Sequence, residues 1–458
     1  MPISRILALA GLLAAAPITA ASSQTLAAQY RPAADSIIAA ALRDSSAWNR
    51  LAELTDRFGN RNSGSAALER AIDWIIAQMQ RDSLQNVRGE PVMVPHWERG
   101  EESAMLVSPR PTKLVMLGLG NSIGTPRRGI EAEVLVVSSF DELTRRAAEA
   151  RGKIVLFDVP YTGYGPTVRY RTGGAVAAAR VGAVASLIRS VAAYSIRSPH
   201  TGVMVYDSTV TRIPAAALSV EDAMMLHRMA DRGERVVVRL TMGARMLPDA
   251  PSRNVMGELV GRERPQEVVV LGGHIDSWDV GAGAMDDGGG VVVSWEAVRL
   301  LQRLGLRPRR TIRVVGWTNE ETGGAGGQAY RDTHRAELGD HVLAFESDGG
   351  VFRPLGFGFT GSDSATALVR QIASLLRPIG ADSVTRGGGG SDIGPIVQLG
   401  VPSMSPNVES SRYFWFHHSE GDTVDKLDAR EMAQCVAAFA VMIYVVADMP
   451  DRLPRVAP

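Results

Sequence analysis

After Pro251 the sequence alternates between short apolar runs and longer amphipathic segments. The apolar runs are typical of buried strands, and the amphipathic segments are typical of helices. Their order is strand 267–273, helix 291–305, strand 310–317, helix 325–335 and strand 342–347. This alternation predicts an α/β fold with a mainly parallel mixed sheet and helices on both faces. In such sheets, ligands bind beyond the carboxyl ends of the strands.

Histidine and acidic side chains follow each of the three predicted strands. His274 and Asp276 follow the first strand. Glu320 and Glu321 follow the second, and Asp348 follows the third. Because the carboxyl ends of parallel strands meet at one edge of a sheet, we expect these side chains to gather there. Carboxylates held this close repel one another unless cations neutralise them, so the arrangement predicts a metal site.

Two further groups can complete this site. Asp286 is followed by a second aspartate and three glycines, which let the backbone turn tightly and bring one carboxylate between two metal ions. His417 and His418 are adjacent, and we expect only one of them to bind metal. Glu346 competes with Asp348 for the same role. Imidazole and carboxylate ligands in this number predict a hydrolase with two zinc ions.

The composition describes an ordinary globular protein. The 458 residues are 45% hydrophobic and 21% charged, and this length allows two or three domains. The formal net charge is zero, so no electrostatic footprint indicates binding to nucleic acid or to an anionic membrane surface.

The N-terminus has the pattern of a secretory signal peptide. Arg5 precedes an apolar stretch over residues 6–18, and small residues follow at 19–23. We therefore expect residues 1–24 to be a signal peptide and the protein to be exported, either to the periplasm or out of the cell. No later segment approaches ~18 uninterrupted apolar residues, so no membrane span is expected in the mature chain.

The local helix and strand patterns of the sequence divide the remaining chain into three parts. Residues 25–110 combine helical patterns with short strands, and we assign them to the N-terminal part of a catalytic domain. Residues 111–247 contain several strands and two helices but no plausible set of metal ligands. We interpret them as an inserted β-rich domain. Residues 248–458 carry the strand and helix alternation and form the main part of the catalytic domain.

Several of these motifs together resemble the carboxypeptidase Q (plasma glutamate carboxypeptidase) family, whose members are exopeptidases with two zinc ions. The similar segments are 272–279, 283–288, 317–321, 346–348, 387–392 and 414–419. The resemblance implies an exported zinc-dependent exopeptidase, acting on dipeptides or short peptides as a carboxypeptidase or an aminopeptidase. It also implies that residues 111–247 form a protease-associated domain, and that the protein is a homodimer.

The resemblance also implies roles for individual side chains. Five of them are zinc ligands, with His274 and Asp348 on one ion, Glu321 and His418 on the other, and Asp286 bridging both. Glu320 is implied as the general base, and Asp276 as the partner that orients His274.

Three finer points follow from the same resemblance. The ligand histidine of the family directly precedes Ser or Thr and lies four residues before an Asp-Thr pair, a pattern that His418 fits and His417 does not. A cis peptide is expected directly after Asp286. Asn319 departs from the family, where alanine is more usual before the paired glutamates.

Three other classes share parts of this pattern. Aminoacylase-class amidohydrolases use a similar ligand order, but their extra domain lies between the paired glutamates and the last histidine, whereas here it precedes His274. Glutaminyl cyclases use a related fold with a single zinc ion, so a metal titration separates them. Receptor-like binding proteins of this architecture lose ligands or the base, and this chain retains all of them.

Overall fold

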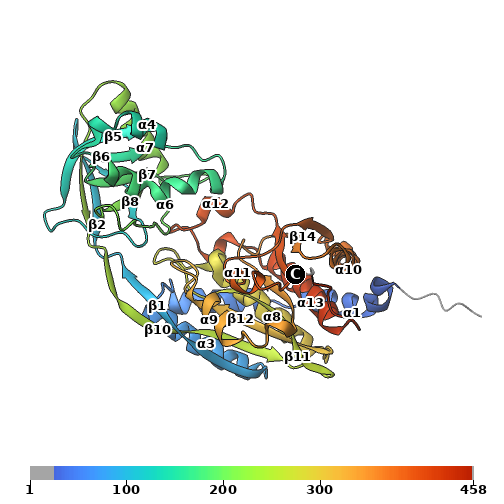
Figure 1. The fold of residues 1–458 in the computed structure, drawn as a ribbon. Helices are drawn as coiled ribbons and strands as arrows, with labels where there is room; N and C mark the ends of the chain where they lie inside the picture. Colours follow the sequence, from blue (N-terminus) through green and yellow to red (C-terminus); the bar gives the residue numbers. More distant parts are fainter. Residues whose placement is uncertain (1–24, 456–458) are drawn as a thin grey trace, which may run out of the picture.

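The computed structural model describes residues 25–455, so the predicted signal peptide lies outside the described residues. The described chain forms two lobes, each built around an eight-stranded sheet (Figure 1). The strands of the main sheet, in spatial order, are β1 (Gln85–Glu98), β10 (Arg245–Leu259), β12 (Arg310–Trp317), β11 (Arg264–His274), β13 (His341–Glu346), β16 (Ser403–Val408), β14 (Pro354–Thr360) and β15 (Ser383–Arg386).

The centre of the main sheet is parallel. β12, β11, β13 and β16 are neighbours that run in the same direction. The pairs β1–β10, β10–β12 and β16–β14 are antiparallel, and β14–β15 is again parallel. The prediction of an α/β fold on a mixed sheet is therefore confirmed.

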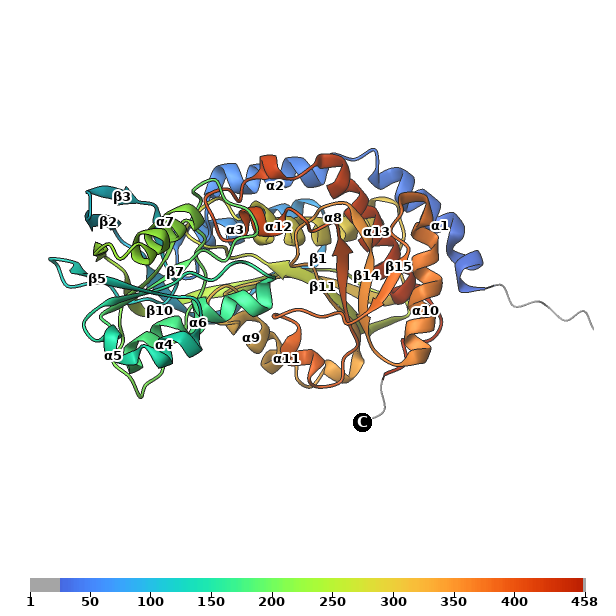
Figure 2. The ribbon, with the colours of Figure 1, turned by 90° about the horizontal axis from the view of Figure 1, so that it is seen from above.

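Helices cover both faces of the main sheet (Figure 2). The helices of the larger core are α1 (Leu26–Ala41), α2 (Ser46–Phe58), α3 (Ala66–Arg81), α8 (Gly289–Arg303), α10 (Asp363–Ala373) and α13 (Ala429–Asp448). The opposite face carries α9 (Ala325–Thr333) and α11 (Gly394–Val397). Side chains of β11 alternate between the two cores: Val269 and Leu271 join the first, and Val268 and Val270 join the second.

Short helical turns connect these elements. They are η1 (Ala284–Gly288), η2 (Leu338–Asp340), η3 (Ser374–Ile379), η4 (Val424–Lys426) and the one-turn helix α12 (Tyr413–Phe416).

The C-terminal helix α13 lies in the centre of the larger core. Its start is fixed by the Asp428 side chain, which accepts the backbone N–H groups of Arg430 and Glu431 at 2.8 and 3.0 Å. By length and composition alone this helix could cross a membrane, but 89% of its most apolar window is buried inside the protein. That burial is typical of the core helix of a globular fold.

The second lobe contains the other sheet and four helices. Its strands, in spatial order, are β3 (Thr112–Leu114), β2 (Glu102–Ser108), β9 (Val237–Met242), β5 (Ile130–Val137), β6 (Ile154–Phe157), β7 (Ala185–Arg189), β8 (Ala215–Leu218) and β4 (Met116–Gly118). Its helices are α4 (Phe140–Arg145), α5 (Ala147–Ala150), α6 (Tyr164–Arg180) and α7 (Val220–Asp231).

The second lobe starts and ends earlier in the chain than the predicted insert, residues 111–247. β2 pairs with β9 in antiparallel register from Glu102 opposite Met242, so residues 102–108 belong to this lobe. The long antiparallel pair of β1 and β10 then carries the chain between the lobes (Figure 1). The sequence pattern missed this boundary because β2 and β9 are far apart in the chain and meet only in the folded protein.

We predict that Leu271→Ala lowers the free energy of unfolding by ~2–5 kcal/mol. Leu271 is fully buried in the central strand β11, so truncation removes apolar contacts and leaves a cavity. Urea-induced unfolding followed by circular dichroism measures the loss. Leu399→Ala is the matched control, because Leu399 is 45% exposed. Equal stability of the two variants would contradict this account of the core.

Candidate metal centre

The parallel register of the sheet brings the predicted ligands to one edge. His274 is the last residue of β11 and lies opposite Trp317 at the end of β12. Gly272 of the same strand lies opposite Glu346 at the end of β13. The loops that carry Glu320, Glu321 and Asp348 therefore leave the sheet beside His274, as the sequence pattern predicts.

Asp286 lies between two histidine and acid pairs. Its Oδ1 is 3.1 Å from His274 Nε2, which is also 3.4 Å from Asp348 Oδ1. Its Oδ2 is 3.3 Å from His418 Nε2, which is also 3.0 Å from Glu321 Oε2. Each oxygen of one carboxylate thus faces a different pair, which is the geometry a bridging ligand needs. The peptide bond between Asp286 and Asp287 is cis, which confirms that expectation.

The donors of this cluster suit zinc. Three groups of ligand atoms within it lie close enough to hold a metal ion. Asp286, His274, Glu321 and His418 are all buried, and Oδ2 of Asp286 and Oε1 of Glu321 have no hydrogen-bond partner within residues 25–455. Imidazole nitrogens and carboxylate oxygens are borderline to hard donors that bind zinc. Orphaned carboxylate oxygens in a buried site indicate a cation, because burying such charge alone is costly.

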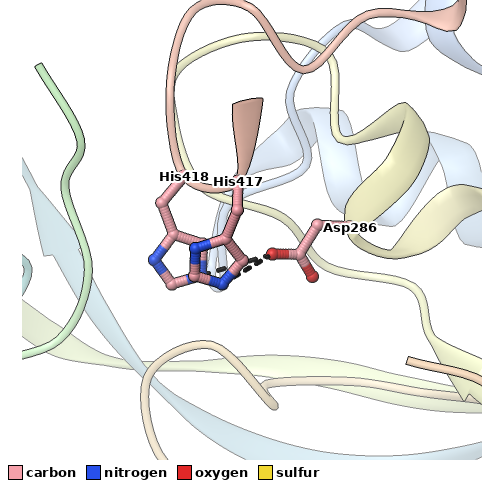
Figure 3. Close-up of side chains that lie close together, drawn as sticks. All are labelled: Asp286, His417 and His418. Atoms are coloured by element: carbon pink, nitrogen blue, oxygen red, sulfur yellow. Dashed lines mark ion pairs between the residues drawn. The ribbon is translucent and has the colours of Figure 1, made fainter. Parts of the chain in front are cut away.

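His417 also points toward Asp286. Its ring stacks on that of His418 with centroids 3.6 Å apart and an interplanar angle of 17° (Figure 3). The Nε2 atom of His417 lies 3.5 Å from Asp286 Oδ2, whereas His418 contacts both Asp286 and Glu321. The contacts therefore favour His418 as the ligand and place His417 beside it, within reach of the same carboxylate.

Other acids of the cluster hold backbone groups. The Asp276 carboxylate accepts the N–H groups of Glu320 and Glu321 at 3.1 and 3.3 Å. The ring of His274 is oriented by the backbone carbonyl of Asp276, 3.0 Å from Nδ1, while the nearest carboxylate oxygen is 3.9 Å away. Asp276 therefore orients His274 through its main chain and fixes the paired glutamates through its side chain.

Two acids that compete for ligand roles have other partners. Asp287 accepts the N–H of His274 at 3.1 Å and that of Gly290 at 3.0 Å, so its two oxygens brace the loop. Glu346 accepts the N–H of Ile393 at 2.8 Å and belongs to none of the candidate metal groups among the described residues. The structure brings Asp348, not Glu346, against His274.

Asn319 braces the turn that carries the paired glutamates. Its φ is +67°, a left-handed conformation that asparagine tolerates better than most residues. Its amide donates to Ser63 Oγ at 2.9 Å and to Thr322 Oγ1 at 2.6 Å, and its carbonyl oxygen accepts the N–H of Ala325 at 3.2 Å. The departure from alanine thus adds hydrogen bonds beside the site.

Arg61 is a supporting residue that the sequence did not reveal. It is completely buried, and its guanidinium donates to the carbonyls of Ile275, Ala282 and Gly283 at 2.8, 2.8 and 2.7 Å. These contacts join the loop after β11 to the segment that leads into Asp286. No local pattern marks Arg61, because these three carbonyls lie more than 200 residues away in the chain.

Asp422 holds the same segment from the other side. Its carboxylate accepts the backbone N–H groups of Ala284, Met285 and Asp286 at 3.1, 2.7 and 3.2 Å. The only sequence signal for it was the Asp-Thr pair after His418. Together with Arg61 it fixes the backbone from which the Asp286 side chain reaches the centre of the cluster.

The electrostatics of the metal-free cluster are strongly perturbed. Burial raises the pKa of Glu321 to about 8 and that of Asp422 to about 7, in each case helped by the nearby Asp286 charge. For His418, burial lowers the pKa, but the Glu321 and Asp286 carboxylates outweigh it and raise the pKa to about 10. The cluster therefore retains protons when cations are absent.

The site opens into a cleft of about 370 Å³ between the lobes. The main lobe lines it with the metal cluster, Glu320, Ser391 and the aromatic residues of α12. The second lobe contributes Tyr164, Arg171 and Val203. A larger cavity of about 630 Å³ lies wholly within the second lobe and contacts none of the cluster, so the smaller cleft is the candidate active site.

This fold and site define the class of metal-dependent peptidases, and the comparisons with known proteins agree. Residues 254–443 match the sequence model of Peptidase family M28. Carboxypeptidase Q of Mus musculus is 53% identical over 408 residues, which are 89% of this chain and 87% of the mouse protein. The Homo sapiens protein is also 53% identical, over 89% of this chain and 86% of its own length.

Solved structures extend this similarity to the whole fold. The peptidase M28 precursor from Shewanella amazonensis SB2B is 36% identical with a TM-score of 0.91, over 94% of this chain and 100% of that chain. BSAP, a zinc aminopeptidase from Bacillus subtilis, is 20% identical with a TM-score of 0.67, over 89% and 96% of the two chains, and shares the fold. The chain belongs to peptidase family M28 as a homologue of carboxypeptidase Q, and is a zinc exopeptidase of that family.

We predict that Asp422→Ala weakens zinc binding about 10- to 100-fold, because it frees the backbone that positions Asp286. Competition with a chromogenic chelator measures the affinity. Asp425→Ala is the matched control, since Asp425 lies three residues away but is exposed in the same segment. Unchanged affinity in the Asp422 variant would mean that these backbone hydrogen bonds do not support the metal site.

We also predict opposite pH trends for the metal-free and zinc-loaded proteins. Raised acid pKa values give stability that is present at low pH and lost as pH rises through about 7 for Asp422 and about 8 for Glu321. The raised pKa of His418 acts in the same direction toward about 10. The metal-free protein should therefore melt at lower temperature at about pH 9 than at about pH 6, while stabilisation by zinc grows with pH. The same change of melting temperature with pH in the metal-free and zinc-loaded proteins would contradict this account.

Proposed function

We propose that this protein is an exported exopeptidase that uses two zinc ions per chain to hydrolyse dipeptides or short peptides. The observation that carries the proposal is the position of Asp286, whose two oxygens face two separate histidine and acid pairs. His274 and Asp348 would hold one ion, Glu321 and His418 would hold the other, and Asp286 would bridge them. When bound, the two ions acidify the attacking water and stabilise negative charge on the substrate carbonyl oxygen.

Glu320 is proposed as the general base. It lines the cleft and is more exposed than the neighbouring Glu321, which lies against His418. Its backbone is held by the Asp276 carboxylate, so its side chain starts from a fixed position. In the proposed reaction Glu320 takes a proton from the attacking water and returns it to the amine of the leaving residue. Asp276 acts as a positioning residue for both His274 and Glu320.

The size of the cleft and the names of the relatives support a short peptide substrate. A volume of about 370 Å³ is at the small end of ligand sites, and residues of both lobes wall it. The curated relatives at 53% identity are carboxypeptidases by name. We propose that dipeptides with a free C-terminus are the preferred substrates.

Further proposals concern the rest of the chain. The second lobe, residues 102–242, is proposed to be the protease-associated domain, inserted between the two parts of the catalytic domain (25–101 and 243–458). Residues 1–24 are proposed to direct export to the periplasm or out of the cell. A homodimer is the proposed assembly.

The proposed function is tested with the purified mature protein and unblocked dipeptides, together with N-blocked and C-blocked analogues. We predict hydrolysis that a chelator abolishes and that zinc restores. Turnover that persists after complete removal of metal would exclude the proposed chemistry. Cyclisation of N-terminal glutamine without peptide cleavage would indicate a cyclase instead.

We predict that Glu320→Gln retains zinc but lowers kcat by ~10²–10⁴, because the amide cannot accept the proton. Steady-state kinetics measure kcat, and elemental analysis measures the zinc content. Glu409→Gln is the control, since Glu409 is only partly buried and lies outside the cleft lining. Near wild-type turnover of the Glu320 variant would place the base elsewhere.

A further inference from the structure

Arg171 brings a positive charge from the second lobe to the wall of the cleft. It lies on α6, and only 4% of its surface is exposed. One terminal nitrogen donates to the hydroxyl oxygen of Tyr164 at 2.9 Å, and the other donates to the carbonyl of Thr201 at 3.3 Å. The same Thr201 carbonyl lies 3.4 Å from Nδ1 of His418. Arg171 and the proposed zinc ligand His418 therefore both contact one carbonyl oxygen.

No carboxylate balances this guanidinium among residues 25–455. Its polar contacts there are a carbonyl, a phenol and an imidazole, and its Nε is buried without a hydrogen-bond partner. Two other buried arginines behave differently: Arg310 is paired with Glu267 at 2.5 Å, and Arg313 with Glu258 at 2.6 Å.

Arg61 is the other buried arginine in this region. It too has no carboxylate partner in the described part of the chain, but backbone carbonyls accept from all three of its guanidinium nitrogens. Arg171 therefore stands out as a buried charge with an unused donor at the edge of a cleft. Such a charge is costly unless an anion reaches it, which indicates that the cleft receives one.

The backbone beside Arg171 leaves room for the guanidinium. Gly202 has a φ of +134°, and a Cβ atom at this position would lie 2.2 Å from the Arg171 terminal nitrogen. Any side chain at this position would therefore displace the guanidinium. The absence of a side chain at Gly202 allows Arg171 to approach the cleft at the level of Thr201 and His418.

The position of Arg171 matches one part of a bound peptide. Its guanidinium contacts the Nδ1 side of His418, at 3.3 Å, whereas Nε2 on the other side of that ring faces Glu321 and Asp286. The charge thus lies about one imidazole ring away from the proposed metal centre. In a peptide, the main chain advances ~3.8 Å per residue. The distance from the reacting carbonyl to the carboxylate of the residue after the scissile bond is therefore comparable to the distance from the proposed metal centre to Arg171.

We propose that Arg171 binds the free α-carboxylate of the residue on the C-terminal side of the scissile bond. The second lobe then selects peptides that end directly after that bond. A planar guanidinium suits this role, because it can donate two parallel hydrogen bonds to one carboxylate. The inference rests on the proposed peptidase function and adds to it the residue that recognises the substrate terminus.

The test compares alanyl-leucine with alanyl-leucinamide as substrates of the wild-type zinc enzyme and of Arg171→Gln. We expect the wild type to prefer the free acid. The variant should lose ~10- to 100-fold in kcat/KM for the acid, the range of a hydrogen bond to a charged group, while the amide changes less than about threefold. Alanyl-glutamate α-amide is a third substrate, which shows whether a side-chain carboxylate can replace the terminal one.

Matched variants separate substrate binding from structural support. Arg169→Gln is the control, because Arg169 is exposed on the same helix two residues away. It should leave the ratio of acid to amide hydrolysis unchanged. Arg171→Lys keeps the positive charge and should retain part of the preference for the acid, which keeps the test valid if Arg171→Gln does not fold. Methylguanidinium should restore hydrolysis of the acid, but not change that of the amide, in Arg171→Ala.

Three results would overturn the inference. The first is a wild-type enzyme that hydrolyses the acid and the amide equally well. The second is an equal loss for both substrates in the variants with unchanged zinc content, which would assign Arg171 to support of His418. The third is a preference for alanyl-glutamate α-amide that depends on Arg171, which would assign it to a side chain. Absence of chelator-sensitive hydrolysis in the wild type would instead contradict the proposed function itself.

Discussion

Repulsion between buried carboxylates is the constraint around which this molecule is organised. Asp286, Glu321 and Asp348 lie within one cluster, where burial and their mutual charges raise the pKa values of Glu321 and Asp348. Water cannot solvate these groups as it does on a surface, so the metal-free cluster retains protons at neutral pH, and bound cations take over the neutralising role of those protons. The fold holds the acids together against this repulsion. Because metal binding relieves the repulsion, the repulsion increases the affinity of the site for metal.

Much of the surrounding structure is explained by that requirement. The parallel strands bring three loops to one edge of the sheet, where each loop contributes a ligand. Arg61 and Asp422 then fix the segment before Asp286 through backbone groups, without placing another free charge on the metal side. The Asp276 carboxylate does the same for the paired glutamates. These supports are rigid and internal, which suits a site whose ligands would otherwise move apart.

The second lobe contacts this site directly. The N–H of Thr201 donates to the carbonyl of His418 at 2.9 Å, and the Thr201 carbonyl faces Nδ1 of the same residue. This contact leaves Nε2 of His418 turned toward Glu321 and Asp286. The phenol ring of Tyr164 stacks on Phe414 with centroids 5.0 Å apart, which joins α6 to α12 at the mouth of the cleft. The second lobe therefore orients one histidine of the cluster and completes the walls of the cleft.

The sequence predicted the parts of this arrangement that have a local signal. The alternation of strands and helices predicted the sheet, and acids at strand ends predicted which loops would meet. The start of the second lobe at Glu102 could not be read in this way, because it depends on pairing with β9 more than 100 residues later. The same holds for Arg61 and Arg171, which reach the metal site through contacts with segments more than 200 residues away. The sequence predicted Asp276 as the partner of His274, but only the folded backbone shows that the Asp276 carbonyl, and not its carboxylate, orients the ring.

Anomalous diffraction at the zinc edge, from crystals of the zinc-loaded protein, tests the central claim most directly. The account predicts two zinc peaks roughly 3.5–4 Å apart, one on each side of the Asp286 carboxylate. One peak should contact His274 and Asp348, and the other should contact Glu321 and His418. A single peak, or zinc bound away from Asp286, would contradict the claim that a pair of cations holds this cluster of acids together.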